Sequence, residues 1–273
     1  AAFALGLSCA FPASADSDTA ALILAVDGTS QWMKTVKRAA REAQLSCPYK
    51  IFYGDGDTSD GVRRLQEEVR DLENDGAHTI YAVPVLISGY SDVARQWKYL
   101  LGAGVQPGFI NNPVFPIEKH ATVRFMEPLN DSAVTVEILL DRAQEISEDP
   151  SKESVIIVTN GPSDDSDNAK WIQILLNLSD RIQKRGGFKS VEGFTLREDA
   201  RAQVRSQAVQ GLRDRVEAID KANSRALLVS LLLSPGGIEH KIGLELRGLN
   251  YAFNTKTLLP DSRISEWIRS QLP

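Results

Sequence analysis

Histidine, cysteine and methionine are scarce in this chain of 273 residues, which has three, two and two of them. Two cysteines, Cys9 and Cys47, are too few for a metal cluster built on cysteine ligands. No stretch approaches the ~18 consecutive apolar residues that a membrane-spanning helix needs. The net charge of −5 shows none of the basic excess that is typical of nucleic-acid-binding domains. The sequence therefore predicts neither a membrane span nor a nucleic-acid partner.

The composition that remains is that of a soluble globular protein, with 42% hydrophobic and 25% charged residues. A chain of this length forms one large domain or two domains of about 130 residues each. Each half is long enough to bury a core of its own. The composition leaves the oligomeric state open.

The first fifteen residues, AAFALGLSCAFPASA, are uncharged, apolar and mostly small. They resemble the hydrophobic and cleavage regions of a secretory signal peptide that lacks its basic start, with Ala13-Ser14-Ala15 as the cleavage site. On this interpretation the mature protein begins near Asp16 and is periplasmic or secreted. The alternative is a ragged terminal helix.

One strand-end pattern occurs twice in the chain. Residues 21–29 (ALILAVDGT) and 154–162 (SVIIVTNGP) are apolar runs that stop at a polar residue followed by glycine, and an amphipathic helix follows each. Each copy also has a later apolar strand that stops at a Ser/Gly-rich turn, VPVLISGY (83–90) and VSLLLSPGG (229–237). The repetition predicts two similar lobes that face each other across a cleft.

The alternation of short apolar runs with helical patterns predicts an α/β fold with a parallel sheet in each lobe. We expect an N-terminal lobe over 16–104, a connecting segment over 105–152 and a C-terminal lobe over 153–273. Strands are expected at 21–26, 49–53, 79–87, 154–159, 188–196, 225–234 and 251–259, and helices at 30–44, 62–75, 91–101, 133–146, 166–184, 198–221, 238–249 and 261–270.

Ligands of parallel sheets bind outside the carboxyl ends of the strands. This rule predicts cleft residues at the four strand ends, namely Asp27, Ser88, Tyr90, Asn160, Gly236 and Gly237. Tyr90 can stack on a flat ring or serve as a rim aromatic, and Asn160 can donate and accept hydrogen bonds or cap a helix.

These segments resemble the class II chelatases, the sirohydrochlorin and cobalt chelatases that insert a divalent metal into a tetrapyrrole, and in particular their exported, duplicated members. The matching text is LILAVDGTSQWMKTV, YAVPVLISGYSDVARQWKYLLG, VIIVTNGPSDDSDNAKW and LLVSLLLSPGGIEHKI, which spans the core of both lobes. The resemblance implies a divalent metal (cobalt, nickel or iron) as substrate, a tetrapyrrole as the small-molecule partner, and no organic cofactor.

Family members typically carry His-Gly at the first strand end and a second histidine in the Ser/Gly-rich turn after the strand that contains Val83-Pro84. Two imidazoles facing across a cleft hold a metal and accept pyrrole protons. Here Asp27, Tyr90 and Asn160 stand where the resemblance leads us to expect histidine. The sequence therefore predicts a chelatase-like scaffold whose own activity has been altered or lost.

His240 is the histidine that falls near a predicted cleft turn, next to Glu239. The functional hypothesis makes these two residues metal ligand and catalytic base, with Asp27 as a second ligand for a metal. The alternative places Glu239 at a helix start, where the helix dipole favours it, beside an exposed histidine. Asp27 likewise has a structural alternative, accepting hydrogen bonds from the next helix.

The loop GDGDTSDG (54–61) resembles the start of a calcium loop, but Asp60 and Gln66 stand where that loop needs glycine and glutamate. Helix capping by Thr58, Ser59 or Asp60 explains the loop better. Three functions stay open: a chelatase-family protein, a non-catalytic periplasmic metal or tetrapyrrole binding protein, and an unrelated two-lobed solute-binding protein.

Overall fold

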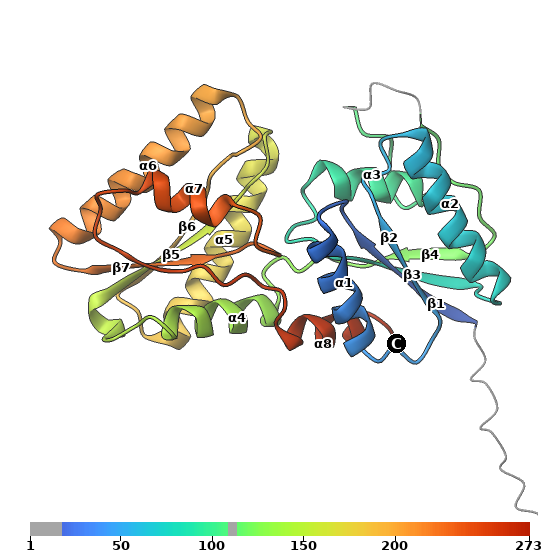
Figure 1. Cartoon of the computed structure of the whole chain (residues 1–273), viewed down its shortest axis with the longest axis horizontal. Coiled ribbons are helices and arrows are strands. Elements are labelled where there is room, and N and C mark those ends of the chain that lie inside the picture. The colour runs from blue at the N-terminus through green and yellow to red at the C-terminus, as the bar shows by residue number, and fades with distance from the viewer. Residues whose placement is uncertain (1–17, 109–113) are drawn as a thin grey trace, which may run out of the picture.

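Two four-stranded parallel sheets form the framework of the computed structural model, which describes residues 18–108 and 114–273 (Figure 1). The predicted signal segment 1–15 lies outside the described residues. The N-terminal sheet has the order β2-β1-β3-β4 and the C-terminal sheet the order β6-β5-β7-β8. The α/β fold with two similar lobes is thus confirmed.

The elements of the N-terminal part are β1 (Thr19–Ala25), α1 (Ser30–Glu42), β2 (Tyr49–Tyr53), α2 (Ser59–Asn74), β3 (Thr79–Pro84), α3 (Asp92–Leu100), β4 (Thr122–Phe125) and α4 (Ala133–Gln144). A short 3-10 turn, Pro150–Lys152, leads to β5 (Glu153–Thr159), α5 (Asp165–Gly186), β6 (Ser190–Thr195), α6 (Ala202–Lys221), β7 (Arg225–Ser230), α7 (Ile238–Glu245), β8 (Ala252–Asn254) and α8 (Ser262–Ser270).

Alternate residues of the central strands face different cores, as the twofold period of a strand requires. In β1, Leu22 and Leu24 belong to a core with α2 and α3, whereas Ile23 belongs to a larger cluster. In β5, Ile156 belongs to a core with α6, whereas Ile157 joins the same large cluster as Ile23. One hydrophobic cluster therefore runs through both lobes.

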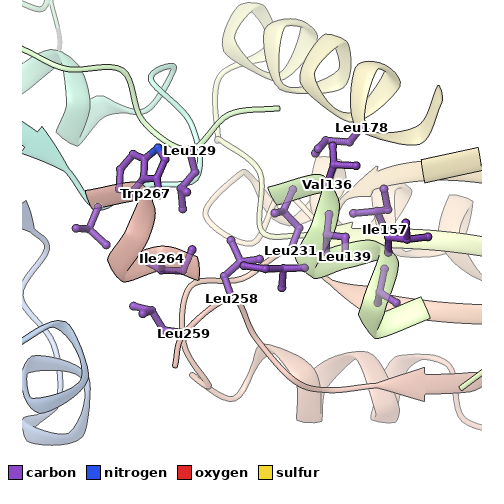
Figure 2. Close-up of a cluster of buried hydrophobic side chains, with 14 of the residues drawn as sticks. Leu129, Val136, Leu139, Ile157, Leu178, Leu231, Leu258, Leu259, Ile264 and Trp267 are labelled. Carbon is purple, nitrogen blue, oxygen red and sulfur yellow. The ribbon is translucent and has the colours of Figure 1, made fainter. Parts of the chain in front are cut away.

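The last helix of each lobe packs on the other lobe. Helix α4 follows β4 of the N-terminal sheet but packs against α5 and β7. Helix α8 follows β8 of the C-terminal sheet but packs against α1 and α4, and it lies between the lobes in Figure 1. Figure 2 shows Trp267 of α8 beside Leu129, and Leu258 between Ile264 of α8 and Leu231. This exchange joins the two lobes through buried apolar contacts.

Strand β4 was not predicted from the sequence. It pairs in parallel with β3, with Ala82 opposite Phe125, and so adds residues of the expected connecting segment to the N-terminal sheet. The hydrophobic pattern of this strand is weak, because it has only four residues and none of them is fully buried.

The expected strand 251–259 is wrong in its second half. Beyond Asn254 the chain leaves the ladder, because the side chain of Asn254 accepts a hydrogen bond from the amide of Lys256. The amides of Leu258 and Leu259 then donate to the carbonyl groups of residues 232 and 233. Helix α7 also ends at Glu245, four residues before the expected end.

Candidate functional site

A pocket of about 470 Å³ lies where the carboxyl ends of both sheets meet. Its walls include Val26 after β1, Ile87 after β3, Asn160 after β5 and Leu233 after β7. In the N-terminal sheet the strand order reverses between the neighbours β1 and β3, and in the C-terminal sheet it reverses between β5 and β7. Ligands of α/β sheets bind at such switch points. The two switch points therefore open into one shared pocket.

Apolar side chains form the walls of the pocket and aspartates form much of its polar lining. The apolar lining residues are Val26, Leu86, Ile87, Val93, Pro162, Trp171 and Leu233, and the acidic ones are Asp92, Asp164, Asp167 and Asp199. This volume and lining are typical of small-molecule sites, which are mostly apolar with a few polar groups that orient the ligand.

Asp167 is held in a lobe-to-lobe ion pair. Its side chain is 4% exposed, and it accepts a hydrogen bond of 2.5 Å from Nη1 of Arg95, which lies on α3 of the other lobe. Lys170 pairs with the same carboxylate at 3.3 Å. Burial opposes the charge of Arg95, but its hydrogen bonds to Asp167 and Asp92 outweigh burial and raise the pKa of Arg95. Asp167 therefore serves to join the lobes.

Asp164 caps helix α5. It accepts hydrogen bonds from the hydroxyl of Ser166 and from the amide of Asp167, and these bonds lower the pKa of Asp164. Asp164 is thus the N-cap residue of α5, and its carboxylate stabilises the start of this helix.

The loop after β5 is shaped by Arg197, which is 6% exposed. Its guanidinium donates to the carbonyl groups of Pro162 and Ser163, each at 2.6 Å, and pairs with Asp165 at 2.7 Å. Gly161 needs its φ of +72° here, and a Cβ at this position would lie 2.5 Å from Cβ of Thr195. These contacts fix the wall of the pocket that carries Asn160.

Two of the predicted site residues line the pocket. Ser88 is 1% exposed, and its Oγ accepts a hydrogen bond from the amide of Tyr90 at 3.1 Å. Asn160 donates from Nδ2 to Asp199 at 3.3 Å, and among the described residues its buried Oδ1 has no hydrogen-bond partner. The pocket wall thus carries one buried acceptor that has no protein partner within the described residues.

Asp27 and Tyr90 make other contacts. Asp27 pairs with Arg64 at 3.5 Å, and its side chain is 62% exposed. The cap of α1 is Thr29 instead, whose Oγ1 accepts from the amide of Trp32. The ring of Tyr90 lies 5.1 Å from Nζ of Lys170.

The backbone carbonyl of Tyr90 accepts a hydrogen bond from Nε1 of Trp171 at 3.1 Å. Tyr90 thus contributes to the contact between the lobes.

Gly236, Gly237, Glu239 and His240 lie at the start of α7, outside the lining of this pocket within the described residues. Gly237 has a φ of +88° and precedes the first residue of α7. Glu239 accepts a hydrogen bond from the amide of Gly236 at 3.4 Å, which matches the helix-start alternative. His240 is exposed. The assignment of these residues to metal or proton chemistry stays a prediction.

In residues 18–108 and 114–273, no group of three or more His, Cys, Asp and Glu side chains is arranged to hold a metal ion. The other two histidines lie at the amino ends of strands in the N-terminal sheet, away from the pocket. His78 precedes β3, and the amide of His120, just before β4, donates to Glu73. In the same ranges, no helix combines the length and apolar character needed to cross a bilayer.

Residues of the loop 54–61, which resembles the start of a calcium loop, make other interactions. Thr58 caps α2 through the amide of Gly61, as the capping alternative predicted, and Asp60 pairs with Arg63 at 2.6 Å. Burial, together with the nearby charges of Asp57 and Asp27, raises the pKa of Asp55.

No protein-family model matches the sequence, and no curated protein matches it. Among solved structures, the chain is similar to SirB from Bacillus subtilis with Fe3+, with a TM-score of 0.64 over 93% of this chain and 94% of that one. The chain has a chelatase-like fold. The sequence identity is 13%, so the likeness is one of fold alone.

A second similar structure is DR2241 from Deinococcus radiodurans, a multi-domain protein with structural similarity to chelatases and two additional novel domains. Its TM-score is 0.55 with 16% identity, and the match covers 93% of this chain and 54% of that one.

Sequence reasoning missed much of the pocket. Asp92, Asp167 and Trp171 lie on helices that begin after the strand ends, and Asp199 follows β6. The signal that could have found them is the helix start itself, because the first turn after a strand end points to the same edge of the sheet.

Proposed function

We propose that this protein binds a tetrapyrrole, a metal ion or both in the pocket between its lobes, as an exported, non-catalytic relative of the chelatases. The observation that carries the proposal is the shared pocket at both switch points of a chelatase-like fold. Its apolar walls suit the faces of a flat ring, and the unpaired Oδ1 of Asn160, buried in its wall, suits a ring N–H. Of cobalt, nickel and iron, iron has the better support, because SirB was solved with Fe3+.

Binding without insertion is proposed because two carboxylates of the pocket, those of Asp164 and Asp167, are already engaged. Metal insertion needs a base that removes the pyrrole protons. Asp167 pairs with Arg95 and Lys170, and Asp164 accepts the hydrogen bonds that cap α5. The hydrogen bonds to Asp164 lower its pKa, which makes this carboxylate a weaker base. We therefore expect binding of the ring to be stronger than any acceleration of its metallation.

The test is an absorption titration of the full chain with sirohydrochlorin. We expect saturable binding that Leu233→Trp weakens at least tenfold, because the larger side chain fills the pocket. Leu244→Trp is the matched control, since Leu244 is 47% exposed and lies outside the lining. Equal affinity of the wild type and the Leu233 variant would refute this pocket as the site.

Catalysis is measured separately, by adding Fe²⁺ or Co²⁺ to sirohydrochlorin with and without protein and following the Soret band. We expect equal rates. A faster rate with protein would support the chelatase hypothesis instead. Loss of that acceleration in His240→Ala would assign the activity to the predicted pair Glu239 and His240.

Capture of a metal ion alone is a second candidate, because four aspartates line the pocket and hard cations prefer carboxylate oxygens. It requires these side chains to move on binding, since within the described residues no three of them are arranged to hold an ion. Calorimetry with Fe³⁺ supplied as its citrate chelate, in the absence of any tetrapyrrole, tests this candidate. Binding of iron that is weakened when Asp92→Asn and Asp199→Asn are combined supports it.

Export is tested by N-terminal sequencing of protein from its native host. A chain that begins near Asp16 supports a periplasmic or secreted location.

A further inference from the structure

The exposed face of α1 carries a row of basic side chains. Lys34, Lys37, Arg38 and Arg41 are all exposed and, at spacings of three, four and seven residues, lie on one side of the helix. The opposite side of α1 packs on the sheet through buried residues such as Val36 and Ala40. The basic row therefore points away from the core.

The row is almost free of acidic partners. Arg38 has one weak pair, with Glu42 at 3.8 Å, and no ion pair is found for the other three within the described residues. Some exposed cations on other helices pair along their helix, as Arg63 does with Glu67 at 2.5 Å. Like charges at these spacings destabilise a helix. A chain with a net charge of −5 thus concentrates unpaired positive charge on one face.

These four side chains and Tyr49 line a depression of about 190 Å³. Tyr49 begins the edge strand β2 and is 37% exposed, so its ring is partly open to solvent. From Lys34 to Arg41 the helix rises roughly 10 Å, at ~1.5 Å per residue. A concave surface with four cations spread over this length suits an extended anion better than a single carboxylate.

We propose that the face formed by Lys34, Lys37, Arg38, Arg41 and Tyr49 binds a phosphate-bearing polyanion. Phosphate oxygens accept charge-assisted hydrogen bonds from both arginine and lysine, and arginine binds them in a bidentate manner. Tyr49 supplies a flat face and a hydroxyl at the edge of the depression. The same phosphate chemistry is offered by a soluble polyphosphate ester and by the headgroups of an anionic lipid surface.

Two arms of one experiment distinguish these sources. The full chain is titrated calorimetrically with inorganic tripolyphosphate at 50 mM NaCl, and it is sedimented with vesicles of phosphatidylglycerol and phosphatidylcholine. The test variant is the double substitution Lys37→Gln with Arg38→Gln. The matched control is Lys189→Gln with Arg247→Gln, two exposed cations of the other lobe for which no ion pair is found among the described residues.

We expect binding in one arm, which identifies the source, and a loss on the order of 30-fold in the test variant, since each basic residue near an anionic surface contributes about a factor of five. Binding should also weaken as NaCl is raised to 300 mM, because salt screens exposed charges. Because like-charge contacts are removed, the thermal midpoint of the test variant should stay equal or rise. Absence of binding in both arms, or equal losses in the test and control variants, would overturn the proposal.

Discussion

The exchange of α8 between the lobes predicts that one substitution on this helix destabilises both lobes together. Ile264 is fully buried within the cluster that runs through both lobes (Figure 2). Ile264→Ala removes three carbon-sized groups, which costs about 2 kcal/mol in transfer free energy at ~0.8 kcal/mol per group. The cavity left behind raises the expected loss to about 3 kcal/mol, within the range measured for buried Ile→Ala changes.

The assay is guanidinium unfolding followed by circular dichroism, combined with hydrogen exchange read by mass spectrometry. We expect faster exchange in α1 of the N-terminal lobe and in α4, because α8 packs against both helices. Glu266→Ala is the control, since Glu266 is exposed on the same helix. That control should stay within about 0.5 kcal/mol of wild type.

Two results would refute the reasoning. A loss below about 1 kcal/mol would mean that α8 contributes little burial. Faster exchange in α4 alone, with α1 unchanged, would mean that α8 does not stabilise the N-terminal lobe.

Two further predictions concern acid stability and the pocket loop. Hydrogen bonds from Arg263 lower the pKa of Asp261 below its unfolded value near 3.9, so its stabilising effect is present above about pH 4 and is lost as pH falls through the lowered pKa. Asp261→Asn should therefore lower stability at pH 7, and its difference from wild type should shrink below pH 4 in a series of denaturation curves. Gly161→Ala should cost more unfolding free energy than Gly187→Ala, by about 1–3 kcal/mol. Both glycines have positive φ, but only at Gly161 would the new Cβ meet Thr195, and equal losses would contradict this.

Most of the fold could be predicted because the central strands are long and apolar. β1 and β5 are buried along nearly their whole length, and each is followed by a helix of clear amphipathic period. The edge element β4 could not be predicted, because four half-exposed residues carry little pattern. The exchange of α4 and α8 also leaves no trace in local periodicity. The exchange depends on which lobe the buried face of each helix packs against, and this is decided only by the folded chain as a whole.

The sequence predicts the position of the candidate pocket better than the residues that line it. The strand-end rule placed the pocket at the correct edges of both sheets, and Ser88 and Asn160 line it. The rule says nothing about side-chain direction, which depends on charged neighbours distant in sequence. Arg95 lies 72 residues before its partner Asp167, so the pair could not be foreseen from either helix alone.

The two equivalent strand ends show how charged neighbours give similar sequences different side-chain positions. Asp27-Gly28 and Asn160-Gly161 follow corresponding strands, and both glycines are tightly packed, against Trp32 and Thr195. Asp27 has a cation, Arg64, within 3.5 Å, and its carboxylate lies largely in solvent. Asn160 has no charge to satisfy, and its amide hydrogen bond to Asp199 holds it in the pocket wall. At this turn Asp27 therefore lies in solvent beside Arg64, whereas Asn160 lies in the pocket wall. The polar chemistry of the pocket consequently comes mainly from the C-terminal lobe, and Asp27→Asn should affect ligand binding far less than Asn160→Ala does.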